Sequence, residues 1–240
     1  SAIKKAKRVS QFSNESVLIE GESGTGKELF SNAIHNASVR SKTGKMISIN
    51  CGAFSDELFR AELFGFLKGS FTGAEKDQDG LIAAAEDGTL FLDEIADLSL
   101  NNQKLLLRFL TDGMVTKIGE THGRNINVRI IAASNKNLLS QIEKNLFRED
   151  LYFRLSTFTI SLPSLKERKD DIKVLSEFYL SEINNEYSEY PDFLPKELSN
   201  EALNELKKYN WPGNIRELII CLKNCIVFSE NEVIEAEDVR

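Results

Sequence analysis

The residues best suited to chemistry form a glycine-rich loop, Gly21-Glu22-Ser23-Gly24-Thr25-Gly26-Lys27, followed by Glu28. This spacing matches G-x-x-x-x-G-K, the phosphate-binding loop of nucleotide hydrolases. Glycines let the backbone curl so that its N–H groups face phosphate oxygens, and the N-terminus of a following helix favours negative charge. The apolar run before the loop predicts a buried strand, and apolar residues at helical spacing after it predict a helix. A chance glycine-rich turn would not carry both neighbours, so we interpret Lys27 as a ligand of the β- and γ-phosphates.

Two adjacent carboxylates supply the second half of such a site. The apolar run from Gly88 to Leu92 predicts a strand that ends in Asp93 and Glu94. Many phosphate loops carry Ser or Thr after the lysine to hold magnesium, and Glu28 stands there instead, so Asp93 is the expected Mg²⁺ ligand. Glu94 is placed to polarise the attacking water. A solvated turn is the alternative reading, and the phosphate loop upstream favours catalysis.

Composition limits the classes of protein. The chain has 240 residues, is 41% hydrophobic and carries a net charge of −7, which is enough for a full core and argues against a nucleic-acid clamp. No signal peptide or membrane-length apolar run is visible, so we expect a cytoplasmic protein without a membrane partner. Cys51, Cys221 and Cys225 form no metal pattern, and the last two share a predicted helix face, where packing is favoured over zinc or a disulfide.

Apolar strands alternate with helical patterns over the first two thirds of the chain. The strands are expected at 17–20, 46–50, 90–93, 128–133 and 157–162, with helices at 102–112 and 138–145. This alternation predicts an α/β fold whose parallel sheet is covered on both faces. After Pro163 we expect only helices, at 170–187, 199–208 and 214–229. The expected domains are therefore an α/β nucleotide-binding domain, 1–163, and a small all-helical lid, 164–240.

Several further motifs carry a family resemblance. They are Glu62-Leu63-Phe64-Gly65, the run from Phe147 to Leu155, and Trp211-Pro212-Gly213-Asn214-Ile215-Arg216-Glu217-Leu218. With the loop and the acidic strand, they resemble the central AAA+ ATPase domain of NtrC-like bacterial enhancer-binding proteins, which activate sigma-54 RNA polymerase. The resemblance covers nearly the whole chain and implies a three-layer P-loop AAA+ domain with a helical lid, ATP and Mg²⁺ as cofactors, and Mg-dependent ATP hydrolysis. In this family Glu commonly follows the loop lysine, as Glu28 does here.

One six-residue segment points to a protein partner. Gly69-Ser70-Phe71-Thr72-Gly73-Ala74 resembles the GAFTGA loop through which the family contacts sigma-54, with Ser70 in place of the usual alanine. A phenylalanine between flexible glycines suits a mobile apolar contact better than core packing. A hairpin buried in the domain is the alternative. The resemblance implies that these six residues bind the sigma-54 holoenzyme.

Other roles follow from the resemblance by matched position. Asn50 resembles the asparagine that holds the catalytic glutamate, and Ser134-Asn135 resembles the sensor pair that detects the γ-phosphate. Arg148 and Arg154 resemble arginine fingers, which stabilise charge on a neighbouring subunit's γ-phosphate. A surface ion pair with Glu149 or Asp150 is the alternative for each arginine. Arg216 resembles the second sensor, which reaches the nucleotide from the lid.

The resemblance implies an ATP-driven ring, expected to be a hexamer, that remodels the closed complex of sigma-54 RNA polymerase into an open one. We expect the sequence to be a fragment whose DNA contact is made by a helix-turn-helix domain outside it. A nucleotide-binding regulator that does not engage sigma-54 is one alternative, and another AAA+ remodeller is the other. The first would be expected to lose the loop at 69–74 or the acidic pair, and the second would lack Phe71-Thr72 in this frame.

Overall fold

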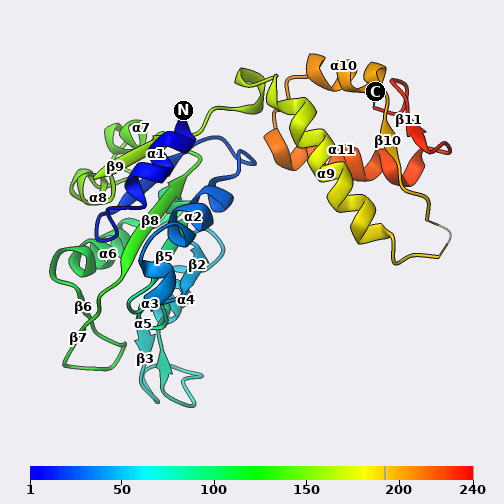
Figure 1. Cartoon of the computed structure of the whole chain (residues 1–240). Helices are drawn as coiled ribbons and strands as arrows, with labels where there is room; N and C mark the ends of the chain where they lie inside the picture. The colour runs from blue at the N-terminus through cyan, green and yellow to red at the C-terminus, as the bar shows by residue number, and fades with distance from the viewer. Residues whose placement is uncertain (192, 240) are drawn as a thin grey trace. The chain divides into compact units, whose positions relative to one another are not determined.

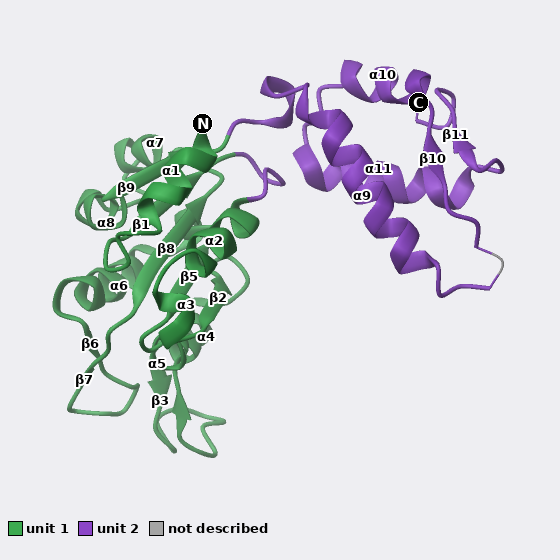
Figure 2. Ribbon diagram, in the orientation of Figure 1, with its two compact units in different colours: residues 1–21, 27–162 green, residues 22–26, 163–240 purple. Residues whose placement is uncertain are grey.

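The structure, a computed structural model, describes residues 1–191 and 193–239. These residues form two compact units, coloured separately in Figure 2. One unit comprises residues 1–21 and 27–162, and the other comprises residues 22–26 and 163–240. Loop residues 22–26 therefore group with the C-terminal helices, although the expected division places them in the first domain.

A five-stranded parallel sheet forms the centre of the first unit, with strand order β2-β5-β8-β1-β9 (Figure 1). The five strands predicted from the sequence are all present, and no bound differs from the prediction by more than one residue. Their bounds are β1 (Val17–Glu20), β2 (Met46–Asn50), β5 (Thr89–Asp93), β8 (Arg129–Ser134) and β9 (Phe158–Ser161). The parallel α/β fold predicted from the sequence is thereby confirmed.

Helices cover both faces of this sheet, because successive side chains of each strand point to opposite sides. Val17 and Ile19 pack in one cluster with α1 and α2, whereas Leu18 packs in another with α4, α6 and α8. The unit is therefore built in three layers. The helices are α1 (Ala2–Val9), α2 (Lys27–Asn36), α3 (Arg40–Thr43), α4 (Asp56–Phe64), α5 (Leu81–Ala84), α6 (Leu100–Asp112), α7 (Leu138–Glu143) and α8 (Glu149–Leu155), with a 3₁₀ turn at Ile95–Asp97.

Two short hairpins extend from the first unit, and neither was predicted. One pairs β3 (Gly65–Phe66) with β4 (Gln78–Asp79), and the other pairs β6 (Met114–Val115) with β7 (Arg124–Asn125). The hairpins lie side by side, since the N–H of Leu67 donates to the carbonyl of Ile118 at 3.0 Å. Strands of two residues are too short to show a period of two, so the sequence pattern is silent about them.

Buried arginines close the sheet at the amino ends of its strands. Arg129, fully buried, donates from Nη2 to the carbonyl of Val9 at 2.8 Å and from Nε to that of Glu15 at 3.3 Å. Arg40, also buried, donates to the carbonyl of Ser13 and to the side chain of Asn127. Burial, with the nearby charge of Arg40, lowers the pKa of Arg129 to about 10. These bonds fasten the segment after α1 to the sheet.

Three helices form the core of the second unit around Leu218, Leu222 and Trp211. They are α9 (Asp171–Tyr187), α10 (Asn200–Lys208) and α11 (Asn214–Phe228), and a 3₁₀ turn at Leu165–Glu167 precedes them. The expectation of helices alone is wrong here, because β10 (Glu197–Leu198) pairs in parallel with β11 (Val233–Ile234). This pairing joins residues 36 positions apart, which local periodicity cannot reveal. Of the helices within 1–191 and 193–239, none has the length and apolar character needed to cross a membrane.

Candidate functional site

Lys27 begins α2 at the carboxyl edge of the main sheet. It is 8% exposed, and its Nζ donates to the carbonyl of Gly21 at 2.8 Å. Gly21 in turn donates its N–H to the carbonyl of Ser134, at the end of β8. The start of the loop is thus fixed to the sheet by backbone bonds, and the ammonium group of Lys27 is held at this edge.

The loop itself, residues 22–26, needs glycine at two positions. Gly24 and Gly26 have φ of +78° and +98°, a region that L side chains rarely adopt. A Cβ on Gly24 would also lie 2.2 Å from the carbonyl oxygen of Gly213. Both glycines are therefore required by backbone conformation, and Gly24 is also required by the close approach of the chain before α11.

Residues at the start of α11 hold this loop. The buried Asn214 donates from Nδ2 to the carboxylate of Glu22 at 3.1 Å and to the carbonyl of Ser23 at 3.0 Å. Arg216 donates from Nη1 to the Ser23 hydroxyl at 2.9 Å. The sequence singled out Arg216 and missed Asn214, whose only signal is its place within the Trp-Pro-Gly-Asn-Ile-Arg run.

Asp93 and Glu94 stand at the end of β5, as predicted. Asp93 accepts the N–H of Glu94 at Oδ1 (2.9 Å), and Glu94 has φ of +53°, which is uncommon for a residue other than glycine. Neither carboxylate makes an ion pair within the part of the chain that the structure describes. Both oxygens of an unneutralised carboxylate are available to a metal ion or to water.

Asn50 lies beside these acids on β2, since it pairs in register with Asp93. Its Nδ2 lies 3.5 Å from Oε2 of Glu94, and its Oδ1 accepts the N–H of Gly52 at 2.9 Å. A Cβ on Gly52 would lie 3.4 Å from the same Glu94 oxygen. Asn50 is thus fixed at one end and touches Glu94 at the other, an arrangement that allows the carboxylate to change partner.

Asn135 follows the end of β8 on the same edge, beyond Ser134, which pairs in register with Glu20. The next residue, Lys136, donates to Asp97 at 2.5 Å, and Asp97 belongs to the turn that follows Glu94. Sequence reasoning missed this ion pair, because nothing local relates two residues 39 positions apart. It joins the segment of Asn135 to the segment of Glu94.

Burial changes two pKa values near this edge. Burial raises the pKa of the Glu20 carboxyl at the end of β1. Burial also raises the pKa of the Cys51 thiol, and the charges of Asp93, Asp97 and Glu94 add to the effect. Cys51 therefore stays a protonated thiol beside the acids and does not compete for a metal as a thiolate.

The two candidate arginine fingers lie at opposite ends of α8. Arg148 precedes α8 and makes a two-point contact with Asp150, with hydrogen bonds of 3.0 and 2.7 Å, which raises the pKa of its guanidinium. Arg154, at the other end of α8, donates to the carbonyl of Leu110 and lines a cavity with residues that precede β1 and β8, Ser16 and Val128. The structure thus does not bring Arg154 to the edge that carries Asp93.

The loop at 69–74 is a tight turn beyond β3. Gly69 donates its N–H to the carbonyl of Ala74 at 2.9 Å, and both Gly69 and Gly73 have positive φ. Phe71 is 44% exposed, and its ring meets that of Phe66 edge-on at 4.9 Å. Phe71 therefore packs against Phe66 on one side and is exposed to solvent on the other, which argues against a fully buried hairpin.

Two family descriptions cover the chain. Residues 1–161 match the Sigma-54 interaction domain, and residues 166–240 match the AAA+ ATPase lid domain. The chain therefore belongs to the sigma-54 interaction domain family of AAA+ ATPases.

Individual relatives agree with this placement. The transcriptional regulatory protein GlrR of Escherichia coli K12 is 41% identical over 97% of this chain and 51% of its own length. The Nif-specific regulatory protein of Azotobacter vinelandii is 42% identical over 97% of this chain and 43% of its own. NtrX from Brucella abortus, solved in complex with ATP, superimposes with a TM-score of 0.87 at 31% identity, over 100% of this chain and 54% of that one. The chain spans about half the length of these relatives.

Proposed function

We propose that this chain is the ATP-hydrolysing module of a sigma-54-dependent transcription activator, which remodels the closed promoter complex into an open one. One observation carries the proposal. A chain that belongs to the sigma-54 interaction family keeps the complete phosphate loop and, at the end of β5, two adjacent carboxylates that make no ion pair within residues 1–191 and 193–239. A regulator that had lost hydrolysis would not need Asp93 and Glu94 in this arrangement.

The residues present fit ATP and Mg²⁺. Loop residues 21–28 offer backbone N–H groups and a helix N-terminus to the phosphates, and Lys27 adds a positive charge. Asp93 is the proposed metal ligand, because its carboxylate is not neutralised by a cation in residues 1–191 and 193–239. When bound, Mg²⁺ would neutralise charge on the β- and γ-phosphates. That NtrX was solved with ATP and with ADP supports the choice of nucleotide.

In this proposal Glu94 accepts the proton of the attacking water as a general base. Asn50 holds Glu94 away from that water until nucleotide arrives, for which their 3.5 Å contact is the support. Asn135 detects the γ-phosphate from the end of β8, and Arg216 detects nucleotide from α11. The Ser23 contact of Arg216 and the Lys136–Asp97 ion pair support these two assignments.

Arg148 and Arg154 are proposed to act on the nucleotide of a neighbouring subunit. Arg154 lies at the end of the sheet remote from Asp93, so a role in its own site is disfavoured. Such a role requires a ring, which we propose to be a hexamer. Arg148 must break its ion pair with Asp150 to act. Because the pair is exposed to solvent, breaking it costs little free energy.

The six residues from Gly69 to Ala74 are proposed to contact sigma-54, with Phe71 as the apolar contact. We also propose that residues 1–163 and 164–240 are the two domains, with DNA contacted by a helix-turn-helix domain outside this sequence and the protein acting in the cytoplasm. Residues 163–240 do form a compact unit, which supports the boundary, although that unit also takes in residues 22–26.

Transcription from a sigma-54 promoter tests the proposal. Purified chain, ATP and holoenzyme should yield open complexes, and Phe71→Ala should abolish them while ATP turnover stays within about twofold, because Phe71 lies outside the phosphate site. The exposed Phe228→Ala, at the end of α11, is the matched aromatic control. Turnover without open complexes in the unmodified chain would favour a different AAA+ remodeller, and nucleotide binding without turnover would favour a regulator that only binds.

A further inference from the structure

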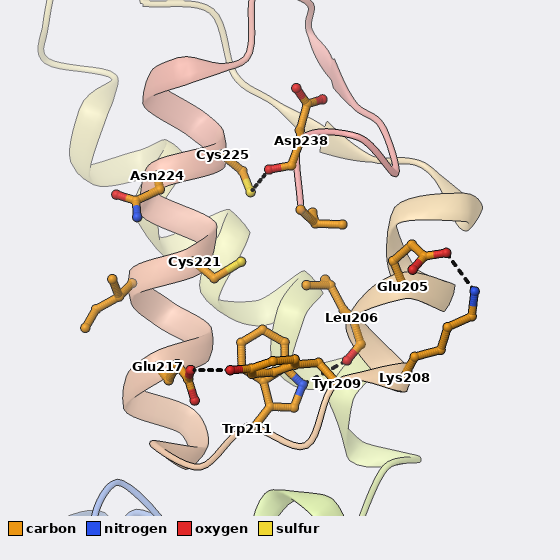
Figure 3. A pocket seen from close by; sticks show the side chains of 12 residues that line it. Glu205, Leu206, Lys208, Tyr209, Trp211, Glu217, Cys221, Asn224, Cys225 and Asp238 are labelled. Atoms are coloured by element: carbon orange, nitrogen blue, oxygen red, sulfur yellow. Dashed lines mark hydrogen bonds and ion pairs between the residues drawn. The ribbon is translucent and has the colours of Figure 1, made fainter.

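An apolar groove lies within the second unit, between α10, α11 and the segment that follows β11 (Figure 3). Its volume is about 660 Å³. Leu206, Tyr209, Trp211 and Ile220 form much of its wall, and Cys221 and Cys225 enter it from α11. None of the roles assigned above uses this groove.

Two thiols point into the groove from one helix face. Cys221 and Cys225 are four positions apart, and Figure 3 shows both sulfur atoms directed from α11 toward the groove. Cys221 is half-buried and reachable, whereas Cys225 is 3% exposed and lies against the carbonyl of Asp238 at 3.2 Å. The pair is therefore one accessible thiol with a second thiol behind it.

The spacing disfavours a disulfide and a zinc site. Residues i and i+4 of a helix have Cβ atoms about 5–6 Å apart, and a disulfide needs about 3.5–4.5 Å. Zinc needs four ligands, and the described residues contain no group of three or more His, Cys, Asp or Glu side chains that would hold a metal. A single soft atom that bonds to two sulfurs spans a wider gap than an S–S bond, and it needs no third protein ligand.

We propose that the groove is a dithiol site for organic compounds of trivalent arsenic, in which Cys221 and Cys225 both bond to the arsenic atom. Trivalent arsenic with one organic substituent has two positions left for sulfur. The apolar wall, with Tyr209 and Trp211 packed edge-on at 5.0 Å, provides the surface that an aryl substituent needs.

The reaction is balanced without an oxidant. In an arylarsonous acid two As–O bonds break and two As–S bonds form, the two thiol protons leave with the two hydroxyl groups as water, and arsenic stays trivalent. Cys221 attacks first, because it is the more exposed of the two thiols, whereas Cys225 is buried and donates to the carbonyl of Asp238. Cys225 then closes the ring within the same molecule, where its effective concentration is high, and gives up its bond to Asp238.

Phenylarsine oxide and the purified chain test the site. Trp211 is the single tryptophan of the chain and lines the groove, so its fluorescence reports occupancy. The unmodified chain should take up one phenylarsenic group by intact mass and change its tryptophan emission. Cys221→Ser and Cys225→Ser should each raise the dissociation constant by about 100-fold or more, because one of the two linked bonds is lost. Cys51→Ala is the matched control and should bind as the unmodified chain does.

A second measurement does not depend on the variants folding. Phenylarsine oxide should protect Cys221 and Cys225 of the unmodified chain from maleimide, as located by peptide mapping, with no change in the labelling of Cys51. Equal affinity of the single variants, or protection confined to one cysteine, would overturn the proposal. A Cys221–Cys225 disulfide in the chain purified in air would also overturn it, because the thiols would then not be available.

Discussion

Charged side chains differ in burial and in hydrogen bonding between the two ends of the main sheet. At the amino ends of the strands, Arg40 and Arg129 are buried. All three guanidinium nitrogens of Arg40 donate to carbonyl or side-chain oxygens, and Arg129 donates from Nε and Nη2, whereas its buried Nη1 has no partner among the described residues. At the carboxyl ends, Asp93 and Glu94 are only partly buried, make no ion pair within the described residues, and include a backbone with positive φ. The same strands thus carry buried, hydrogen-bonded arginines at one end and partly exposed carboxylates at the other.

This difference indicates that the arginines of the amino edge stabilise the fold, whereas the carboxylates of the carboxyl edge take part in the reaction. A buried charge is tolerated when its hydrogen bonds are made, and such a group stabilises the fold but has nothing left to offer a ligand. Carboxylates that make no ion pair contribute less to stability and can offer their oxygens to a metal ion or to water. We therefore expect substitutions at the carboxyl edge to change turnover and spare folding, and those at the amino edge to do the reverse.

The largest effect is expected at the carboxyl edge. Glu94→Gln should lower ATP turnover by about 100-fold or more, since an amide cannot act as a general base, and it should leave ATP bound. Lys27→Ala should instead weaken ATP binding. The Glu94 variant should unfold in urea within about 0.5 kcal/mol of the unmodified chain. The exposed Glu57→Gln is the control for loss of a carboxylate, and turnover of the Glu94 variant at the control's level would remove Glu94 from the mechanism.

Arg154 tests the expectation that only the carboxyl edge takes part in catalysis. It lies toward the amino ends of the strands, and yet it is proposed to act in ATP hydrolysis. An arginine finger contributes roughly 10³–10⁵ in rate in GTPase systems, so Arg154→Ala should nearly abolish turnover and spare ATP affinity. Arg148→Ala should behave alike. Turnover per subunit should also rise with protein concentration as rings assemble.

Mixing two inactive chains locates the action of Arg154. A ring that contains Lys27→Ala and Arg154→Ala subunits has some interfaces with an intact loop facing an intact arginine, so partial turnover should return. Light scattering and cross-linking would establish that the subunits mix. Mixed rings without recovered turnover would mean that Arg154 acts within its own subunit or supports the fold through its bond to Leu110.

The amino edge should show the next largest effect. Arg129→Met keeps much of the buried volume but removes the side-chain donor of the Glu15 carbonyl and leaves the carbonyl of Val9 with the N–H of Phe12 alone, which should cost about 2–3 kcal/mol of unfolding free energy. Arg108→Met removes an arginine that is exposed and should cost no more than about 0.5 kcal/mol. Turnover per folded molecule should be unchanged in both variants. A specific loss of turnover in Arg129→Met would mean that the amino edge also contributes to catalysis.

The sequence predicted the carboxyl edge better than the amino edge, and the reason is physical. The loop, Asp93-Glu94 and Asn135 each adjoin an apolar strand, so local periodicity and the order of parallel strands place them together. Arg129 sits next to a strand in the same way, yet its partners at Val9 and Glu15 lie more than a hundred positions away. No local pattern distinguishes it from an exposed flanking arginine.

The same limit explains the other omissions. The β10–β11 pair and the Lys136–Asp97 ion pair join distant residues, and the two hairpins are too short to carry a period. Asn214 was visible only as part of a motif, because its role depends on Glu22 and Ser23 at the far end of the sequence. The assigned roles of the site residues remain predictions until the substitutions above are measured.

The smallest expected effect concerns the two histidines of the chain. His35 is buried at the amino edge, where its Nδ1 lies 2.9 Å from the hydroxyl of Thr89, whereas His122 is exposed in the second hairpin. Burial and the charge of Arg129 lower the pKa of His35 in the folded chain. Above the ordinary value of about 6.5 the ring is neutral in both states, and folding has its full stability. As the pH falls below that value the unfolded chain takes up a proton first, so the free energy of unfolding should decrease until the folded pKa is passed.

Urea unfolding at a series of pH values should therefore show a shallower decline below about 6.5 in His35→Gln than in the unmodified chain. His122→Gln should parallel the unmodified chain, and equal slopes in all three would mean that the amino edge does not exclude a proton from His35.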